Sequence, residues 1–540
     1  MTQTFNLADV FESVADVCPD RTAVATPNRD VTFAELDERA NRLAHHLEEQ
    51  GIGAGDHVAL LLQNGTEYLE AMLGAFKLRA VPINVNYRYV ERELAYLLAD
   101  ADAVALVGHR RFLERVEAAG DACPKLRHLV SVDDGSTAPL GQSVEYESAL
   151  ASASPARPSG IERSGDDLFI AYTGGTTGLP KGVVWRHEDL FFGALGGGTS
   201  PVEPPADSPA DVPARVKEDH TALLVVPPLM HVAAQWAAFS MLVQGNTVVL
   251  TSPGAFDPVE ILGLIAANRV MTCLVVGDAM ARPLADAMAS EDQPHDLTSL
   301  RVVASGGAGL STAVKEELRS QLPDLIITDG YGSTETGVAG FQASLPGQKE
   351  RSRAFNMDAT TTVLDDDGVP VSPGSGTVGR LARRGHLPMG YYNDEEKTAA
   401  TFREIDGVRW VLPGDMATVE SDGTITLLGR GSVSINTGGE KVFPEEVEEI
   451  VIGHPSVFDA LVIGLPDQRW GSSVTAVVSL RPDAALELSQ LREHCRADLA
   501  DYKLPRRLVV VPAISRGPNG KPDYPWALET AAASREDDSL

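Results

Sequence analysis

Amphipathic stretches and short apolar runs alternate through the first part of the chain. The stretch 33–50 carries apolar residues at helical spacing, namely Leu36, Ala40, Leu43, Ala44 and Leu47. This spacing predicts a helix with one buried face, and Thr32 with Glu35 three positions on fits a capping box at its start. The apolar run 57–62 follows a Gly-rich turn and predicts a buried strand.

The same alternation continues well beyond this point. A further helix is predicted for 67–78, and apolar runs predict strands at 80–85, 220–226, 246–250, 271–276, 300–304 and 325–328. Strands that alternate with helices favour an α/β fold with layered, mostly parallel sheets. Two segments interrupt this pattern: 133–160 is predicted to be a surface excursion, and 194–219 a mobile loop, because Gly, Pro, Ser or Asp dominate them.

The pattern changes near Arg430. Beyond it, Pro444 and several acidic residues open a predicted helix, and strand-like runs follow. We therefore predict a large N-terminal domain over residues 1–430 and a small, mobile α+β C-terminal lobe over 431–540, with the hinge near 430–432. A chain of 540 residues is in any case too long for a single core.

Charge and cysteine content narrow the functional classes. The formal net charge of −31 argues against nucleic acid or an anionic membrane surface as a partner. The four cysteines are widely separated and form no C-x-x-C pair, so neither a zinc site nor a disulfide framework is predicted. The sequence shows no secretory leader and no run of about 18 apolar residues, so we expect a cytoplasmic protein without a membrane span.

The most informative segment is the Gly- and Thr-rich run 172–182, which follows a predicted strand. Its candidate phosphate ligands are Thr173, Gly174, Gly175, Thr176, Thr177, Gly178 and Lys181. Glycine lets the backbone approach an anion closely, so that N–H groups and hydroxyls can surround phosphate oxygens while lysine adds a positive charge. The run is not a Walker A loop, because Pro180 precedes the lysine and Gly182 follows it. A simple Gly/Thr turn is the alternative.

This run resembles the phosphate-binding signature of the adenylate-forming superfamily, which includes acyl-CoA synthetases, luciferases and the adenylation domains of peptide synthetases. Gly175, where many members have Ser, makes it most similar to actinobacterial fatty-acyl and steroid side-chain CoA ligases. Five motifs in family order, spread over residues 172–521, carry the resemblance. It implies that the run binds ATP phosphates and that Thr173 and Lys181 take part in catalysis.

Two further segments resemble the nucleotide site of this family. In 329–337, the resemblance implies that Tyr331 stacks on adenine, Thr334 contacts the α-phosphate and Glu335 helps to hold magnesium. The other nucleotide contacts implied there are Asp329, Gly330, Gly332 and Ser333. In 305–310, the residues expected against adenine and the acyl group are Ser305, Gly306, Gly307 and Ala308. Both segments also fit polar turns at strand ends.

Asp415 matches the carboxylate that binds both ribose hydroxyls in the family, and a carboxylate suits a diol because it accepts two hydrogen bonds. Many relatives have Arg-Thr-Gly-Asp here. This chain has Leu412-Pro413-Gly414-Asp415, so a role of that Arg or Thr does not carry over. Arg430 also resembles a ribose contact, and the hinge position two residues on is Ser432 instead of Asp or Lys.

Two segments beyond the hinge resemble parts that act in different half-reactions. Gly438, Gly439 and Lys441 match the loop that rotates in to line the pantetheine tunnel. Lys521 matches the adenylation lysine, and a mobile lysine can offset the charge that grows in the transition state. A linker turn and a solvated tail lysine are the ordinary alternatives.

His231 is expected, from the resemblance, at the mouth of the acyl pocket. Trp236 and Phe239 follow at helical spacing. They fit pocket lining and protein core equally well.

Together, the resemblance implies an AMP-forming acyl-CoA ligase that uses ATP, Mg²⁺ and coenzyme A. A carboxylic acid would be joined to AMP with loss of pyrophosphate, the C-terminal lobe would swing about Ser432, and the CoA thiol would attack the acyl-adenylate. A medium- to long-chain fatty acid or a steroid side-chain acid is favoured as substrate. Dimers are common in the family, but the sequence does not fix the oligomeric state.

Three other functions stay open at this level. They are an amide synthetase that captures the adenylate with an amine, an adenylating enzyme that loads a separate carrier protein, and a non-enzymatic binding protein of the same fold. An N-terminal oxidoreductase is not supported, because no G-x-G-x-x-G follows the first strands.

Overall fold

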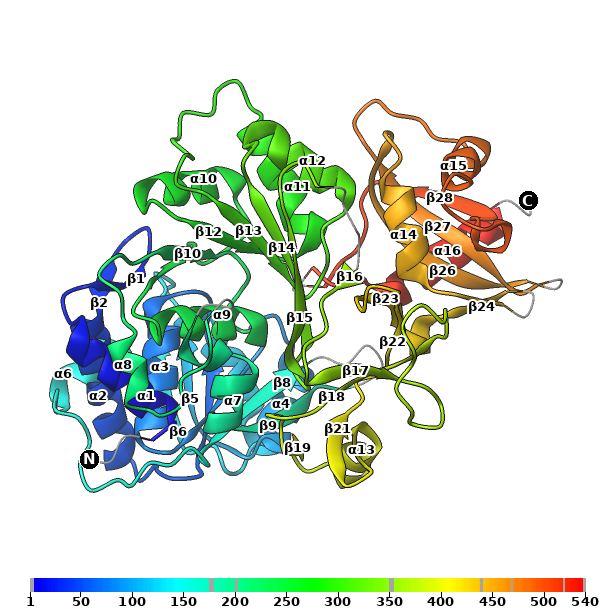
Figure 1. The fold of residues 1–540 in the computed structure, drawn as a ribbon. Coiled ribbons are helices and arrows are strands. Elements are labelled where there is room, and N and C mark those ends of the chain that lie inside the picture. Colours follow the sequence, from blue (N-terminus) through cyan, green and yellow to red (C-terminus); the bar gives the residue numbers. More distant parts are fainter. Residues whose placement is uncertain are drawn as a thin grey trace.

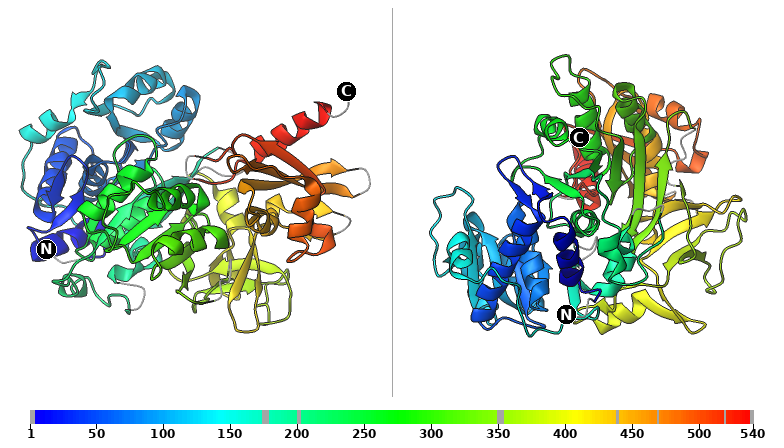
Figure 2. Two further views of the ribbon diagram at one scale, coloured as in Figure 1. Left: turned by 90° about the horizontal axis from the view of Figure 1, so that it is seen from above. Right: turned by 60° about the vertical axis from the view of Figure 1, so that its left-hand side comes forward.

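The structure, a computed structural model, describes residues 4–173, 179–199, 203–348, 354–437, 440–467, 470–517 and 520–537. These residues form two large mostly parallel sheets, an antiparallel sheet and a separate C-terminal lobe with its own sheet (Figure 1). The views of Figure 2 show the C-terminal lobe, in orange and red, packed against one side of the larger body. The predicted α/β class, with a large layered N-terminal part and a smaller C-terminal lobe, is confirmed.

The first large sheet has the order β15-β14-β13-β12-β10-β11-β1-β2, parallel except at its two edges. Its strands are β1 (Thr22–Ala25), β2 (Asp30–Thr32), β10 (Ala222–Val225), β11 (Thr247–Leu250), β12 (Thr272–Val275), β13 (Val302–Gly306), β14 (Ile326–Ser333) and β15 (Gly337–Ser344). One face is covered by α10 (Pro258–Ala267), α11 (Gly277–Met288) and α12 (Thr312–Gln321). The apolar side chains of these helices and of the central strands form one core cluster.

The second large sheet has the order β19-β9-β8-β4-β3-β5-β6-β7 and is parallel from β8 to β7. Its strands are β3 (His57–Leu61), β4 (Val81–Asn84), β5 (Ala103–His109), β6 (His128–Val132), β7 (Val144–Glu145), β8 (Leu168–Thr173), β9 (Lys181–Arg186) and β19 (Gly390–Tyr391). Helices α1 (Leu7–Val17), α2 (Phe33–Glu49), α3 (Thr66–Lys77), α4 (Glu91–Asp100), α5 (Leu113–Ala118), α6 (Tyr146–Ser152) and α7 (His187–Gly193) surround it. The short α8 (Asp211–Ala214) packs on α1, and α9 (Val232–Leu242) packs on β10 and β11 of the first sheet. The largest apolar cluster draws residues from both sheets and from α1, α2, α3 and α9, so the two layers form one body.

The antiparallel sheet has the order β16-β23-β22-β18-β21-β20, with β17 paired to β18. Its elements are β16 (Ala354–Phe355), β17 (Thr361–Leu364), β18 (Gly379–Arg383), α13 (Glu395–Thr401), β20 (Phe402–Ile405), β21 (Val408–Val411), β22 (Asp415–Val419) and β23 (Ile425–Arg430). The C-terminal lobe comprises β24 (Ile435–Thr437), β25 (Glu440–Val442), α14 (Pro444–Ile452), β26 (Val457–Asp467), β27 (Gly471–Leu480), α15 (Leu488–Cys495), β28 (Arg507–Val511) and α16 (Tyr524–Asp537). Apolar clusters on both faces of its sheet are built from residues of this lobe alone. The domain boundary at 430–432 itself stays a prediction.

The predicted helix start at Thr32 is confirmed. The Thr32 hydroxyl accepts the Glu35 N–H at 3.2 Å, and the Glu35 carboxylate accepts the Thr32 N–H at 2.8 Å. These reciprocal bonds satisfy two backbone donors that the first turn leaves open.

Two local expectations were wrong. The segment 133–160 is not simply a surface excursion, because it contributes β7 and α6, and Tyr146 is buried with its hydroxyl donating to Glu70 at 2.7 Å. The described part of 194–219 includes α8, with Val212 buried, and the mobility of this segment stays a prediction. The 329–337 segment is a turn only at 334–336, because β14 runs through Ser333 and pairs with β15. In the described part of the chain, no helix has the length and apolar character that crossing a bilayer requires.

Candidate active site

The Gly/Thr run joins two antiparallel strands, β8 and β9. Gly174, Gly175, Thr176, Thr177 and Gly178 lie outside the described residues, but Thr173 and Lys181 face each other across the strand pair at its base. The Lys181 ammonium forms an ion pair with Asp394, and this contact lowers the pKa of the Asp394 carboxyl. Asp394 also caps α13 by accepting the Lys397 N–H at 2.9 Å. The sequence analysis missed Asp394, whose only local signal was an Asn-Asp pair before a helix-like stretch.

Tyr331, Asp415 and Arg430 form a second group, on β14, β22 and β23. The Tyr331 hydroxyl donates to Asp415 Oδ2 at 2.7 Å, and Arg430 Nε lies 3.7 Å from Asp415 Oδ1. Burial and the adjacent carboxylate raise the pKa of Tyr331, so its hydroxyl stays protonated and continues to donate. Asp415 is thereby held in one orientation beside a permanent cation. Such a carboxylate can accept ribose hydroxyls, and this role stays a prediction.

Glu335 lies in the turn between β14 and β15. The Tyr391 hydroxyl donates to Glu335 Oε1 at 2.8 Å, and the Trp185 indole N–H donates to the Thr334 carbonyl at 2.9 Å. Among the described residues, Oε2 of Glu335 has no hydrogen-bond partner. One fixed carboxylate with a remaining oxygen fits a Mg²⁺ ion that takes its other ligands from nucleotide phosphates and water. Sequence reasoning did not find Tyr391.

Lys521 comes from the C-terminal lobe and lies at the cleft of the N-terminal body. Its hairpin is closed by a hydrogen bond from the Gly517 N–H to the Lys521 carbonyl at 2.8 Å. Gly520 has a φ of +71°, and a Cβ there would lie 3.1 Å from Val276 Cγ1, so glycine lets the hairpin approach the body closely. The surrounding protein and the nearby Arg430 lower the pKa of Lys521, although the residue keeps contact with solvent, and the carboxylates Glu335 and Asp415 oppose this effect. The predicted adenylation lysine is therefore brought together with three other predicted site residues.

The residues predicted for the acyl site differ in their surroundings. His231 precedes α9, and burial together with the cations Lys521 and Arg88 lowers its pKa to about 4, so its ring is neutral near pH 7. Within the described residues, the ring Nε2 of His231 and the indole Nε1 of Trp236 are buried without hydrogen-bond partners. Phe239 is core, packed edge-to-face on Phe76 with ring centroids 5.8 Å apart. The buried ring nitrogen of His231 and the buried indole N–H of Trp236 are two polar atoms that a substrate could satisfy, whereas Phe239 favours the core alternative.

Two predicted nucleotide contacts have clear structural partners. Ser305 Oγ accepts the Gly277 N–H at 2.9 Å and donates to the Ala308 carbonyl at 2.6 Å, which fixes the turn containing Gly306 and Gly307. Asp329 is buried, and it binds the Lys315 ammonium at 2.6 Å and the Leu310 N–H at 3.0 Å. Both side chains therefore stabilise the backbone of this part of the site. Their direct contact with a nucleotide stays a prediction.

Of the residues predicted for the pantetheine loop, the structure describes Lys441. Gly438 and Gly439 are outside the described residues, and Lys441 is exposed on β25. Figure 1 shows β24, which pairs with β25, on the side of the C-terminal lobe that faces away from the body. In this lobe arrangement Lys521 faces the cleft, whereas Lys441 is exposed on β25.

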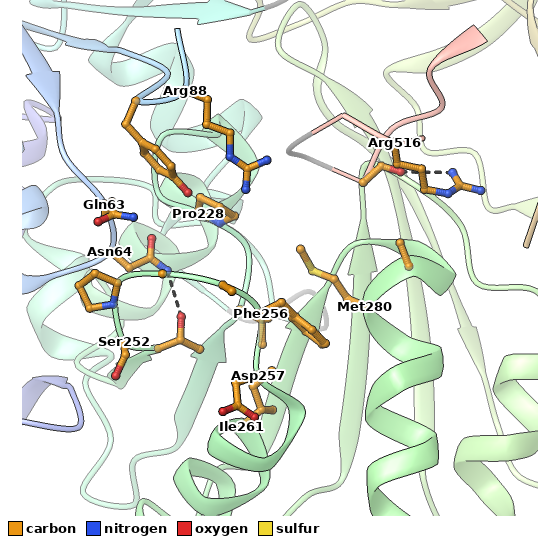
Figure 3. Close-up of a pocket in the computed structure, with 18 of the residues that line it drawn as sticks. Gln63, Asn64, Arg88, Pro228, Ser252, Phe256, Asp257, Ile261, Met280 and Arg516 are labelled. Atoms are coloured by element: carbon orange, nitrogen blue, oxygen red, sulfur yellow. Dashed lines mark hydrogen bonds between the residues drawn. The ribbon is translucent and has the colours of Figure 1, made fainter. Parts of the chain in front are cut away.

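A cavity of about 260 Å³ lies between the body and the Lys521 hairpin (Figure 3). Arg88, Met280 and Phe256 line it from the body, and Arg516, Gly517 and Gly520 line it from the C-terminal lobe. Figure 3 shows Arg88 and Arg516 on opposite sides of the cavity. The lining mixes apolar side chains with polar ones such as Asn64 and Asp257. Arg516 is already paired with Asp459, and Arg88 offers a positive charge to an anionic group of a ligand. Sequence reasoning did not single out Arg88 or Arg516.

Comparison with known proteins agrees with this geometry. The AMP-binding enzyme family matches residues 11–392, and the AMP-binding enzyme C-terminal domain matches residues 446–521. The chain is 46% identical over 533 residues to the 3-oxocholest-4-en-26-oate–CoA ligase of Rhodococcus rhodochrous, covering 97% of this chain and 95% of that protein. It is also 46% identical over 543 residues to a medium/long-chain-fatty-acid–CoA/3-oxocholest-4-en-26-oate–CoA ligase of Mycobacterium tuberculosis, covering 100% and 98%.

The fold comparison adds a solved structure with a bound intermediate. An anthranilate CoA ligase in complex with anthranoyl-AMP superposes with a TM-score of 0.85 at 26% identity, covering 100% of this chain and 99% of that chain. Family match, curated relatives and fold agree over essentially the whole chain. The Gly/Thr run and the C-terminal lysine resemble motifs of this family. The chain therefore belongs to the AMP-binding enzyme family.

Proposed function

We propose that this enzyme is an acyl-CoA ligase that joins a carboxylic acid to AMP, releases pyrophosphate and then transfers the acyl group to coenzyme A. The observation that carries the proposal is Lys521, which shares a cleft with Glu335, Asp415 and Arg430 although it belongs to another lobe. A cation delivered by a separate lobe can act in one half-reaction and leave for the next.

In the first half-reaction the enzyme mainly positions charges. Asp415 and Arg430 would hold the ribose, and Lys181 with the Gly/Thr run would hold the phosphates. Mg²⁺, bound by Glu335 and the phosphates, would neutralise phosphate charge. Lys521 would lie between the acid's carboxylate and the α-phosphate, where negative charge crowds as the new bond forms.

In the second half-reaction the Lys521 hairpin would withdraw and the 438–441 loop would take its place. The cavity supports this order, because residues 516, 517 and 520 of the hairpin close one of its sides. We propose that the cavity admits the pantetheine arm once the hairpin leaves. Arg88 offers a cation at its wall for a phosphate group of coenzyme A.

For the acid, we propose a medium- to long-chain fatty acid or a steroid side-chain acid. The names of the two curated relatives support this class. The apolar α9 segment beside His231 is suited to an apolar acyl chain, and Trp236 supplies an indole N–H for an oxygen of the acid. We also propose a cytoplasmic location, because the reaction consumes ATP and coenzyme A, and a homodimeric state that native mass spectrometry would test.

The decisive experiment is a panel of acids assayed for pyrophosphate release with and without coenzyme A. Fatty acids of graded length and steroid side-chain acids are expected to release pyrophosphate, and thioester is expected only when coenzyme A is present. Amines in place of coenzyme A serve as the control for an amide synthetase. Amide product without thioester would reject the choice of acceptor, and no acid-dependent pyrophosphate release would reject the proposed reaction.

A further inference from the structure

A cluster of charged residues joins the C-terminal lobe to the body on the side of α11 and α12. Arg481, which follows β27, donates from Nη2 to Glu317 Oε1 on α12 at 2.6 Å. The same oxygen accepts Nη1 of Arg282 on α11 at 3.2 Å. One carboxylate thus connects two guanidinium groups, and the contact with Arg481 crosses between the lobes.

Arg282 is buried to an unusual degree for a cation, with 1% of its side chain exposed. Phe458 of the C-terminal lobe lies over its guanidinium, with the ring centroid 5.7 Å from Cζ. Within the described residues, Nε and Nη2 of Arg282 have no hydrogen-bond partner, and a second carboxylate, Asp278 Oδ2, lies 3.9 Å from Nη2 as a longer ion pair. A buried guanidinium depends strongly on the carboxylate that is hydrogen-bonded to it, so Glu317 matters to both sides of the contact.

A second charged group links this interface to the Lys521 hairpin. Arg516 donates two hydrogen bonds to Asp459 of β26, at 2.8 and 2.6 Å, and a third to the Gly520 carbonyl at 3.3 Å. Asp459 directly follows Phe458, and Asp278 of α11 lies close enough to Asp459 for the two carboxylates to interact. The β26 segment that covers Arg282 therefore also anchors the hairpin that carries Lys521.

We propose that Glu317 and Arg481, together with Arg282, are positioning residues that hold the C-terminal lobe where Lys521 reaches the cleft, and that their contact breaks before thiol transfer. The inference rests on the two half-reactions of the proposed function. None of the three is placed in the nucleotide or acyl site, so their effect must act through the position of the lobe. A residue that only stabilised the fold would affect both half-reactions alike.

The test is Arg481→Gln, assayed separately in acid-dependent ATP–pyrophosphate exchange and in thioester formation from supplied acyl-adenylate. Because Glu317 and Arg481 are partly exposed, removal of their ion pair should slow exchange by about 2- to 5-fold, while thioester formation stays unchanged or rises. Glu317→Gln should slow exchange by about 10-fold or more, because it also leaves Arg282 buried without its hydrogen-bonded carboxylate. The double variant should be no slower than Glu317→Gln alone.

Arg496→Gln is the matched control, since Arg496 pairs with Glu493 at 3.0 Å within the C-terminal lobe. It should leave both half-reactions unchanged. Arg481→Lys keeps the charge and should recover most of the exchange rate, which distinguishes an ionic contact from loss of folding. The inference would be overturned if Arg481→Gln lost both half-reactions equally or behaved like Arg496→Gln. It would also be overturned if Arg481→Lys did not recover the exchange rate. If the wild-type enzyme itself shows no acid-dependent exchange, the proposed function fails instead.

Discussion

Replacing Lys521 with alanine tests the proposed chemistry most directly. The side chain lies in a cleft with Arg430, Glu335 and Asp415, and it is the group that the C-terminal lobe contributes there. Alanine removes the ammonium without changing the hairpin backbone, which is closed by the Gly517–Lys521 main-chain hydrogen bond. The variant should therefore fold normally and keep the lobe arrangement.

The expected size of the effect follows from the hydrogen bonds that the ammonium would make to the reacting groups. An ammonium between the acid's carboxylate and the α-phosphate makes at least two charge-assisted hydrogen bonds, each worth about 1.5–3 kcal/mol. Two such bonds correspond to about 3–6 kcal/mol, or a loss of roughly 10²- to 10⁴-fold in the rate of adenylation. Because Lys521 leaves the cleft before thiol attack, thioester formation from supplied acyl-adenylate should change by less than about 3-fold, the scale of a weak surface contact.

The assay compares ATP–pyrophosphate exchange with thioester formation from a synthetic acyl-adenylate, using the same enzyme preparation. Lys441→Ala, which changes a lysine of the same lobe on the exposed strand β25, is the control for exchange, because it should not affect adenylation. Equal damage to both half-reactions in Lys521→Ala would refute the reasoning, and so would exchange that persists at the wild-type rate.

The remaining predictions concern pH, the phosphate site and the thiol step. Because the surrounding protein and Arg430 lower the pKa of Lys521, exchange should decline as pH rises through that lowered pKa, and Lys521→Arg should move the alkaline limb to higher pH. Asp394→Asn keeps the helix cap but frees Lys181 for phosphate, so KM for ATP should fall by about 2- to 5-fold in steady-state assays; a rise in KM would contradict competition. Gly439→Leu should block thioester formation while pyrophosphate release continues, and loss of both would argue against a tunnel role. Burial lowers the pKa of His187 to about 4, so its contribution to stability is lost as pH falls from about 6.5 towards 4, by up to about 3 kcal/mol; urea unfolding of His187→Gln should show a smaller loss over that range than wild type.

The periodicity of the chain predicted most of the architecture, because helices and buried parallel strands repeat apolar residues in recognisable ways. The capping box at Thr32 and the helix beginning at Pro444 are local signals and were found. The 133–160 segment was misjudged because its buried Tyr146 depends on Glu70, a partner distant in the sequence. Likewise, the continuation of β14 through Ser333 depends on pairing with β15, which polar, Gly-rich residues conceal.

The site was predictable only where its residues sit in short motifs. Asp394 and Tyr391 were missed because the partner of each lies far along the chain, and Arg88 was missed because it belongs to no recognisable motif. Long-range ion pairs such as Arg481 with Glu317 leave no trace in spacing or periodicity. Such pairs belong to the tertiary fold and become visible only in three dimensions.

The hairpin that carries Lys521 has two roles. Lys521 enters the nucleotide cleft, and Gly517 and Gly520 line the neighbouring cavity. If that cavity is the thiol's route, occupancy by coenzyme A and docking of the lysine exclude each other. Coenzyme A would then bind only after pyrophosphate has left. A large excess of coenzyme A should inhibit the adenylation half-reaction, because it would compete with docking of the Lys521 hairpin. The order of substrate binding would then need no separate regulator, because coenzyme A and the Lys521 hairpin cannot occupy the same space at the same time.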